Sequence, residues 1–318
     1  MKKLLLILIA VLAFITFSSL LSIAFGAFKD DGWGARPLGM GGAYTAFGDD
    51  VNAQLYNPAG IWQVDTFQAT FMYAKLFNGL EDVNLGMNYL SAVYPVKGKV
   101  NIGILWADFV SANQYKEDTF ALSAAMPVTR SISVGTNIKY LNHSYTLDVR
   151  TVDDPVFAGG SSKGAVAADL GIQAVMFDGK QYQTVVGFAA KNINQPDVGL
   201  DSKDLVPAEL RLGFAATFYG KVIVSPALDI GYRNQDYGTD SDKLNVYAGC
   251  ETIFFNGMLA ARAGVNMNEV TLGIGFNPRV RGIETSIDYA FILPLTIQES
   301  SGTHRISLTL HFLPPVLH

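Results

Sequence analysis

Residues 131–145 read SISVGTNIKYLNHSY, and apolar and polar side chains alternate along them. The apolar side chains at alternate positions are Ile132, Val134, Ile138 and Tyr140. The side chains between them are Ser133, Gly135, Asn137, Lys139 and His143. Because successive side chains of a strand point to opposite faces of its sheet, this pattern predicts a strand with one apolar face and one polar face.

The same alternation recurs along the chain after Thr66. It predicts fourteen strands at 67–75, 84–96, 99–109, 118–127, 131–145, 164–177, 181–192, 208–219, 221–233, 242–255, 257–266, 269–277, 282–292 and 303–312. Nearly all of them have the length of about 9–11 residues that crosses a bilayer, whereas soluble strands most often have about five or six. The sequence therefore favours an all-β membrane protein, an antiparallel transmembrane β-barrel of about fourteen strands. A soluble β protein is the alternative, because soluble sheets alternate too.

The connections between the predicted strands alternate in length. Short turns such as 128–130 and 178–180 follow even-numbered strands, and longer connections such as 146–163 and 193–207 follow odd-numbered ones. This alternation is typical of outer-membrane barrels, which have short periplasmic turns and longer outer loops. Only 267–268 departs from it, being short where a long loop is expected. The pattern predicts one barrel over 67–312 with both ends at the periplasmic side.

The N-terminus has the features of a secretory signal. Lys2 and Lys3 precede an apolar run, and the small residues Ala24 and Gly26 stand at the usual positions before a cleavage site. We predict that residues 1–26 are a cleaved signal peptide and that the protein lies in the outer membrane of a diderm bacterium. An uncleaved anchor helix over residues 4–24 is the alternative.

Composition excludes several functions. The formal net charge is −5 and no basic stretch exists, so a nucleic-acid partner is not expected. The four histidines lack ligand spacing, and we predict no metal site and no cofactor. The single Cys250 is predicted to face lipid. Residues 160–164 match the G-x-S-x-G hydrolase pattern, but the predicted strand that follows replaces the helix that this pattern needs, which indicates a protein that is not an enzyme.

Residues 27–66 do not alternate and are rich in Gly and Ala. Asp49 or Asp50 is expected to cap a short helical turn after it. Since both barrel ends are predicted at the periplasmic side, this segment can fold back into the lumen as a hatch. Gly39, Gly41 and Gly42 would then let its backbone pass close to the barrel wall.

The stretch GARPLGMGGAYTAFGDDVNAQLYNPAG, residues 34–60, resembles the N-terminal signature of FadL-like outer-membrane proteins, including the PorV/PorQ branch. This resemblance implies a fourteen-stranded barrel with a lumenal hatch. It implies passage of long-chain fatty acids and other hydrophobic small molecules or, for the PorV-like branch, an accessory role in protein secretion or surface attachment. The hatch or gating residues that match are Arg36, Gly39, Met40, Gly41, Gly42, Asp49, Asp50, Asn57, Pro58, Ala59 and Gly60. The chain is short for the uptake branch, which puts long ligand-capturing outer loops in doubt.

The tripeptide Asn57-Pro58-Ala59 also occurs in water channels. A water channel needs two such tripeptides and several spanning helices, and neither is found here. We expect Pro58 to fix an extended turn where the hatch enters the first strand, with Asn57 hydrogen-bonded to the nearby backbone.

Charged residues occupy the predicted inward faces of many strands. They are Lys139, Asp169, Lys191, Glu209, Arg211, Asp229, Arg233, Glu251, Arg262, Glu284, Asp288 and Arg305. An interior charge without a partner is costly, so a paired network that includes Arg36, Asp49 and Asp50 is favoured over a polar permeation path.

The C-terminal end predicts one more partner. The last strand, HRISLTLHF, ends on the aromatic Phe312 and resembles the strand that the barrel-assembly machinery recognises. Residues 313–318 form a short tail after it, whereas such proteins usually end at the aromatic residue. The expected partners are thus this machinery during biogenesis, outer-membrane lipid, a hydrophobic small molecule and, alternatively, a secretion-system protein.

Overall fold

The computed structural model describes residues 27–28, 32–79, 84–96, 98–112, 114–234, 243–280, 283–295, 297 and 300–312. The predicted signal peptide (1–26) and C-terminal tail (313–318) lie outside these residues. The strands are β1 (Phe67–Lys75), β2 (Leu85–Val96), β3 (Val100–Ser111), β4 (Tyr115–Thr129), β5 (Ile132–Tyr145), β6 (Ser162–Asp178), β7 (Tyr182–Lys191), β8 (Glu209–Phe218), β9 (Ile223–Arg233), β10 (Leu244–Phe254), β11 (Leu259–Asn266), β12 (Glu269–Phe276), β13 (Arg279–Val280), β14 (Ile283–Pro294) and β15 (Thr303–Phe312).

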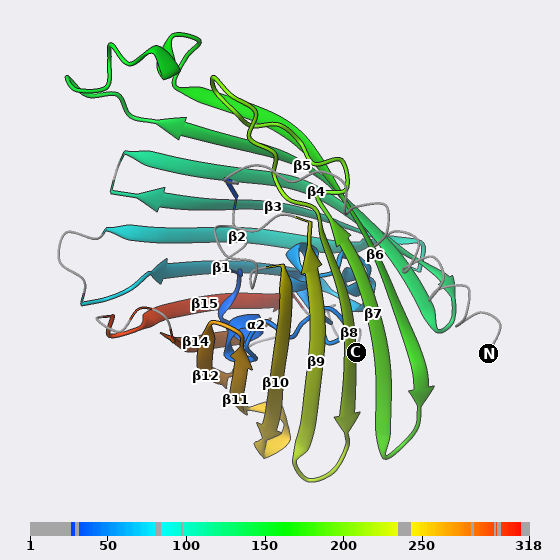
Figure 1. Ribbon diagram of the computed structural model, residues 1–318. Helices are drawn as coiled ribbons and strands as arrows, with labels where there is room; N and C mark the ends of the chain where they lie inside the picture. The colour runs from blue at the N-terminus through cyan, green and yellow to red at the C-terminus, as the bar shows by residue number, and fades with distance from the viewer. Residues whose placement is uncertain are drawn as a thin grey trace.

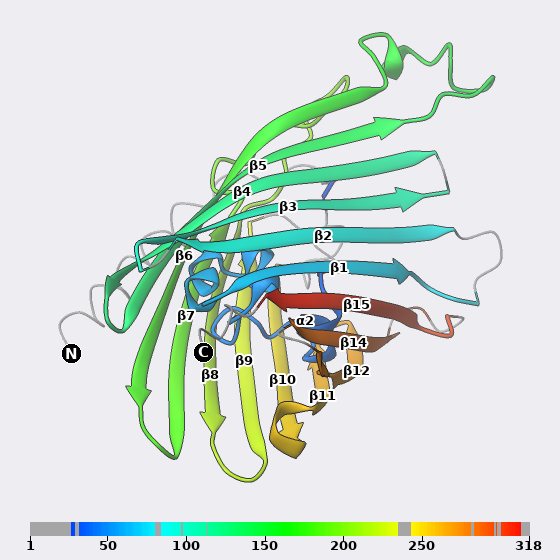
Figure 2. The ribbon, with the colours of Figure 1, turned by 180° about the vertical axis from the view of Figure 1, so that it is seen from behind.

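These strands form one closed antiparallel sheet (Figures 1 and 2). From β1 to β12 each strand pairs with its neighbours in sequence, β1 pairs with β15, and β12 closes the ring on β14. The two-residue β13 only extends the hairpin onto β14, so the barrel has fourteen strands, as predicted. Closure leaves no open edge, which a lipid environment requires because it offers no water to unpaired backbone groups.

The two faces of the wall have opposite chemistry. On β4 and β5 the side chains of Leu122 and Ile138 are 65% and 61% exposed, whereas the adjacent polar side chains of Ser123 and Asn137 are buried. Aromatic side chains gather near the short-turn ends of the strands: Phe67, Tyr94, Phe177, Tyr182, Phe218 and Phe312. An apolar outer band edged by aromatic side chains around a polar interior is the arrangement of a transmembrane barrel.

One connection differs from the sequence expectation. Strand β4 begins at Tyr115 and β3 continues to Ser111, so only residues 112–114 join them at the outer end. The three consecutive charged residues 116–118 interrupt the alternation of apolar and polar side chains, so the sequence did not indicate a strand here. In the structure Lys116 and Asp118 form an ion pair, with Nζ and Oδ1 2.8 Å apart. Two outer connections are therefore short, this one and 267–268.

Residues 32–66, called the lumenal segment below, lie inside the barrel (Figures 1 and 2). They form α2 (Ala35–Gly39) and the 3-10 helices η2 (Val51–Leu55) and η3 (Pro58–Gln63). Among the described residues, the 3-10 turns η4 (Pro155–Phe157) and η6 (Phe255–Gly257) lie in connections between strands. Among the described residues, no helix is long and apolar enough to cross a membrane.

The predicted cap of η2 is confirmed, since the side chain of Asp50 accepts a hydrogen bond from the backbone N–H of Asn52 at 2.8 Å. The expectation for Pro58 is wrong, because Pro58 is the first residue of η3 and fixes no extended turn. Proline suits that position, where its missing N–H would have had no helical partner. The extended residue is Asn57, and residues 64–66 separate η3 from β1.

Glycines on the inner wall let the lumenal segment approach the strands. A Cβ atom at Gly249 of β10 would overlap the carbonyl of Met40, and one at Gly264 of β11 would overlap the backbone of Gly41. A Cβ at Gly171 of β6 would meet the Asn57 side chain. Glycine within a strand often marks such a close backbone approach. The wall is thus shaped to fit the segment.

The exposed apolar face gives a test of membrane embedding. Leu122→Arg should lower the free energy of unfolding in lipid vesicles by about 2–4 kcal/mol, because it places a charge on the lipid face. Val149→Arg is the control, since Val149 lies in an outer connection and is 93% exposed. Urea-induced unfolding followed by tryptophan fluorescence measures both. Equal effects of the two substitutions would show that Leu122 does not face lipid.

The contact between Gly249 and Met40 gives a second test. Gly249→Val should destabilise the protein by at least about 1–3 kcal/mol, because the new side chain overlaps the lumenal segment. Ala248→Val at the adjacent, partly exposed position is the matched control and should cost little. Thermal unfolding gives the stability, and protease cleavage within residues 32–66 reports displacement of the segment. Equal stability and equal protease cleavage of the Gly249→Val and Ala248→Val variants would contradict the close fit between β10 and the lumenal segment.

Candidate functional site

Arg36 is the centre of the polar contacts between the lumenal segment and the wall. Its Nε and Nη2 atoms contact the two carboxylate oxygens of Glu251 on β10 at 3.1 and 2.9 Å. Its Nη1 atom contacts Asp49 at 2.7 Å and Asp50 at 2.9 Å. Burial alone lowers the pKa of Arg36, but the carboxylates of Asp49 and Glu251 raise it above its ordinary value. Arg36 therefore stays charged and joins three carboxylates.

The contacts of Arg36 continue into the wall through Glu251. A carboxylate oxygen of Glu251 also accepts a hydrogen bond from Nε of Arg262 on β11 at 2.6 Å. Arg262 in turn donates to Asp288 on β14 at 2.7 Å. These wall side chains are buried. Together with Asp49 and Asp50 they form the lower ion cluster: Arg36, Asp49, Asp50, Glu251, Arg262 and Asp288.

A second group of charges lies on β5 to β9. Glu209 contacts Arg211 at 2.6 Å, Lys191 at 3.1 Å and Arg233 at 3.7 Å. Nearby, Lys139 and Asp169 form an ion pair at 2.7 Å. Mixed charges thus meet inside the lumen, where pairing offsets their loss of hydration.

The remaining predicted lumen charges have different contacts. Asp229 accepts hydrogen bonds from the backbone N–H groups of Tyr44 and Thr45 at 2.9 and 2.8 Å. Arg305 donates to the backbone carbonyl of Gly32 at 2.7 Å. Glu284 lies apart from the clusters, because it is only partly buried and pairs with the exposed Arg279 at 3.3 Å.

Asn57 fastens the middle of the lumenal segment. Its Nδ2 donates to the carbonyl of Thr45 at 2.8 Å and to that of Ile172 on β6 at 3.0 Å. Its Oδ1 accepts from the N–H of Ala59 at 3.1 Å, while the carbonyl of Ala59 accepts from Ser133 on β5. Gly60 packs against the carbonyl of Gly48, leaving no room for a Cβ. The Asn-Pro-Ala-Gly stretch therefore joins the turns of the segment to two strands.

The glycine stretch contacts the opposite side of the wall. Thr271 Oγ1 on β12 donates to the carbonyl of Gly39 at 3.3 Å and accepts from the N–H of Gly41 at 3.0 Å. Gly41 and Gly42 have φ angles of 65° and 83°, which disfavour residues with a side chain. The two ends of the motif thus attach to different strands around the barrel.

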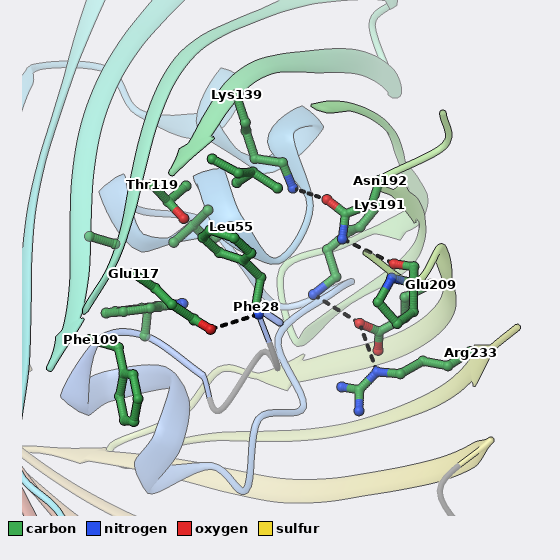
Figure 3. A pocket seen from close by; sticks show the side chains of 14 residues that line it. Phe28, Leu55, Phe109, Glu117, Thr119, Lys139, Lys191, Asn192, Glu209 and Arg233 are labelled. Carbon is green, nitrogen blue, oxygen red and sulfur yellow. Dashed lines mark hydrogen bonds and ion pairs between the residues drawn. The ribbon is translucent and has the colours of Figure 1, made fainter. Parts of the chain in front are cut away.

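A cavity called here the aromatic cavity lies between the lumenal segment and the outer ends of the strands (Figure 3). Its volume is about 60 Å³. Its apolar side chains are Phe28, Trp33, Leu55, Phe109 and Leu141. Its charged side chains are Glu117, Lys139, Lys191, Glu209 and Arg233. The cavity is therefore amphipathic, with apolar groups from both the N-terminal residues and the wall.

Two larger cavities lie on either side of α2. The outer polar cavity, of about 330 Å³, includes Gly41, Arg233 and Asn268. The inner cavity, of about 190 Å³, is lined by Arg36 and by residues near the short-turn ends of the strands, such as Ile253. Arg233 lines both the aromatic and the outer polar cavity. The lumenal segment and the lower ion cluster separate these outer spaces from the inner cavity.

The apolar lining of the aromatic cavity was not among the residues singled out from the sequence. Phe109 lies on the inward face of β3, together with the buried Leu105 and Ala107. The alternation along this strand could therefore have indicated that Phe109 faces the lumen. Phe28 and Trp33 precede any periodic pattern. Within the described ranges, no group of three or more His, Cys, Asp or Glu residues could hold a metal ion. Cys250 is a free, partly exposed cysteine.

Removing Arg36 tests the lower ion cluster. Arg36→Ala should lower the free energy of unfolding by about 3–5 kcal/mol, because buried Glu251 and Asp50 lose a charged partner. Arg279→Ala, which removes the exposed ion pair with Glu284, should cost about 1 kcal/mol or less. Arg36→Lys should cause an intermediate loss of stability, because lysine keeps the positive charge but cannot form two parallel hydrogen bonds to one carboxylate. Thermal unfolding compares them, and a neutral Arg36→Ala would contradict the role of the cluster.

Comparison with known proteins gives similarity at the level of structure. No protein-family model matches the sequence, and no curated protein matches it. The Pseudomonas putida toluene transporter TodX superposes with a TM-score of 0.59 at 12% identity, over 90% of this chain and all of that one. The CymD monoaromatic hydrocarbon channel gives 0.56 at 13% identity, over 91% of this chain and all of that one. A Pseudomonas aeruginosa FadL homologue gives 0.53 at 12% identity, over 87% and 97% of the two chains. The chain thus has the fold of FadL-like barrels, which confirms the fold implied by the resemblance of residues 34–60.

Proposed function

We propose that this protein is a non-enzymatic outer-membrane channel that passes hydrophobic small molecules. The observation that carries the proposal is the aromatic cavity, which lies between the lumenal segment and the outer ends of the strands. Its position is that of a first binding site for a molecule arriving from outside. Pockets for small ligands combine aromatic and aliphatic side chains with polar groups that fix the ligand's orientation. This cavity combines apolar side chains with an equal number of polar and charged ones.

The lumen supports selective passage rather than free diffusion of solutes. The lower ion cluster and the lumenal segment separate the outer cavities from the inner cavity. A molecule leaving the aromatic cavity therefore meets packed side chains, and passage requires a rearrangement of the segment or of the wall. In this proposal residues 32–66 act as the hatch, and the contacts of Arg36, Asn57 and the glycines hold it.

The comparisons support the class of molecule. Of the three similar structures reported above, one is a monoaromatic hydrocarbon channel and one is a toluene transporter. The aromatic cavity of this chain offers apolar contacts to a small ring or to one end of a longer chain. Its volume is about 60 Å³, and an apolar cavity that binds benzene measures about 150 Å³, so side chains must move to admit the ligand. A long-chain fatty acid is the finer hypothesis from the sequence, and it needs a separate test. No feature of the described residues favours an accessory role in protein secretion, which stays the alternative.

Ligand binding can be followed through Trp33, which lines the aromatic cavity. Titration of the nanodisc-embedded protein with toluene, and separately with palmitate, should give a saturable change in tryptophan fluorescence. Trp33→Phe should remove this change. Trp106→Phe should retain it, because Trp106 lies among outward-facing side chains such as Ile104 and Phe120. The ligand that saturates identifies the cargo class.

A matched pair of substitutions tests the cavity itself. Phe109→Ala should weaken binding about tenfold to a hundredfold, because the ligand loses an apolar contact of about 1.5–3 kcal/mol. Phe120→Ala removes an equal side chain from the lipid-facing surface and should leave binding unchanged. Equal affinities of the two variants, or no saturable signal with either ligand, would overturn the proposal. A stable protein partner copurifying in place of ligand would favour the accessory role.

A further inference from the structure

The first described residues lie at the outer end of the barrel and not at its periplasmic end. The backbone N–H of Phe28 donates to Oε1 of Glu117 on β4 at 2.9 Å (Figure 3). The backbone N–H of Ala27 hydrogen-bonds to the carboxylate of Asp204 in the connection between β7 and β8. Both residues pack against the apolar cluster of Leu141, Ala167, Val198 and Val206. The start of the chain's described part is thus held between the wall and an outer connection.

Asp204 has more hydrogen-bonding capacity than Ala27 uses. Its Oδ1 is buried, and no described residue forms a hydrogen bond with it. Its backbone is fixed, because its N–H donates to Asp197 Oδ1 at 3.0 Å and its carbonyl accepts from the N–H of Val198 at 2.8 Å. Burial raises the pKa of the Asp204 carboxyl group. A buried carboxylate with an unused oxygen is costly unless a further donor or a cation reaches it.

The predicted cleavage after Gly26 would supply such a cation. Hydrolysis breaks the bond between the Gly26 carbonyl carbon and the Ala27 nitrogen. Water supplies the hydroxyl of the new Gly26 carboxyl group and a proton to the Ala27 nitrogen, and the second proton moves from the carboxyl group to the amine. The Ala27 nitrogen then carries a positive charge and three N–H donors in place of one.

We propose that Asp204 and Glu117 form a binding site for a primary ammonium group, and that its occupant is the processed N-terminus of this chain at Ala27. The ammonium group reaches the free oxygen of Asp204 and ties the N-terminus to the connection between β7 and β8. Because Phe28 lines the aromatic cavity, this ion pair fastens one side of that cavity more firmly after processing. The inference rests on the predicted cleavage site and is independent of which molecule the channel carries.

The surroundings of the site are compatible with an ammonium group. His143 stacks edge-on against Phe28 and its Nε2 contacts the carbonyl of Val198 at a distance of 2.6 Å. Tyr115 donates to the same Oε1 atom of Glu117 that Phe28 contacts, at 2.6 Å. Asp197 adds negative charge next to Asp204. Lys203, in the same connection, and Lys163, on β6, place positive charge near Asp197. Asp204 thus contacts the Ala27 nitrogen, while Glu117 contacts the adjacent N–H of Phe28 and Asp197 adds negative charge beside Asp204.

The test uses the mature protein purified from the outer membrane. N-terminal sequencing and intact mass should give Ala27 as the first residue. Its α-amine should react with an amine-specific acylating reagent more slowly in the folded protein than in urea, with the exposed Lys203 as internal reference. A neighbouring carboxylate favours the protonated, unreactive form, and about one pKa unit corresponds to a tenfold slower reaction.

Asp204→Asn should restore the reactivity of the α-amine about tenfold. Asp201→Asn is the matched control, because Asp201 is an exposed aspartate in the same connection, and it should change nothing. Insertion of one alanine between Ala27 and Phe28 leaves Asp204 intact but moves the ammonium group, and it should also expose the amine. Mobility on unheated gels checks that each barrel is folded.

Three results would overturn the proposal: a mature N-terminus other than Ala27, an α-amine that reacts equally fast in the wild type and in Asp204→Asn, or equal effects of Asp204→Asn and Asp201→Asn. The measurement contains no transported molecule. Its failure is therefore separate from a failure of the ligand-binding experiments on Phe109 and Trp33.

Discussion

The guanidinium of Arg36, whose side chain is only 16% exposed, is the constraint on which the interior of this barrel depends. A charged group of this kind inside a protein must be met by carboxylates, and Glu251, Asp49 and Asp50 do so. Two of these partners belong to the lumenal segment and one belongs to the wall. Moving the segment away would take the Arg36 guanidinium from the buried carboxylate of Glu251. The ion pairs therefore fix where the segment lies, in addition to stabilising it.

The barrel wall is adapted to this arrangement. Glycines stand where the segment's backbone runs closest, at Gly249 and Gly264, and a threonine on β12 bonds the turn at Gly39 and Gly41. On the other side, Asn57 joins the segment to β6. Polar and small inner residues thus have a structural use, and they do not indicate an open aqueous path. The space that remains is divided into the aromatic and outer polar cavities on one side and the inner cavity on the other.

Much of the fold could be predicted from the sequence, because a strand of a transmembrane barrel must alternate. The predicted strand at 131–145 and the observed β5 differ by one residue. The inward phase of Glu251, Arg262 and Asp288 follows from the same rule. Which of these side chains pair with one another could not be predicted. Pairing depends on the stagger between neighbouring strands, and the alternation of side chains does not determine that stagger. The start of β4 was missed where charged residues interrupt the pattern.

The lumenal segment shows the opposite case. It has no periodicity, so its helices and the role of Pro58 depend on contacts with strands far away in sequence. For the same reason the lining of the aromatic cavity was not predicted, since Phe28, Leu55 and Phe109 meet only in the folded barrel. The Asp50 cap and the local bonding of Asn57 were predictable, because both are interactions between close neighbours in sequence.

The segment that Arg36 holds in place fills the lumen. Single-channel recording of the wild-type protein in planar lipid bilayers is the sharpest test of this arrangement. The protein should insert without steady ionic current, because the segment blocks a continuous aqueous path through the barrel. A stable, ohmic conductance of the size found for open porins would contradict it.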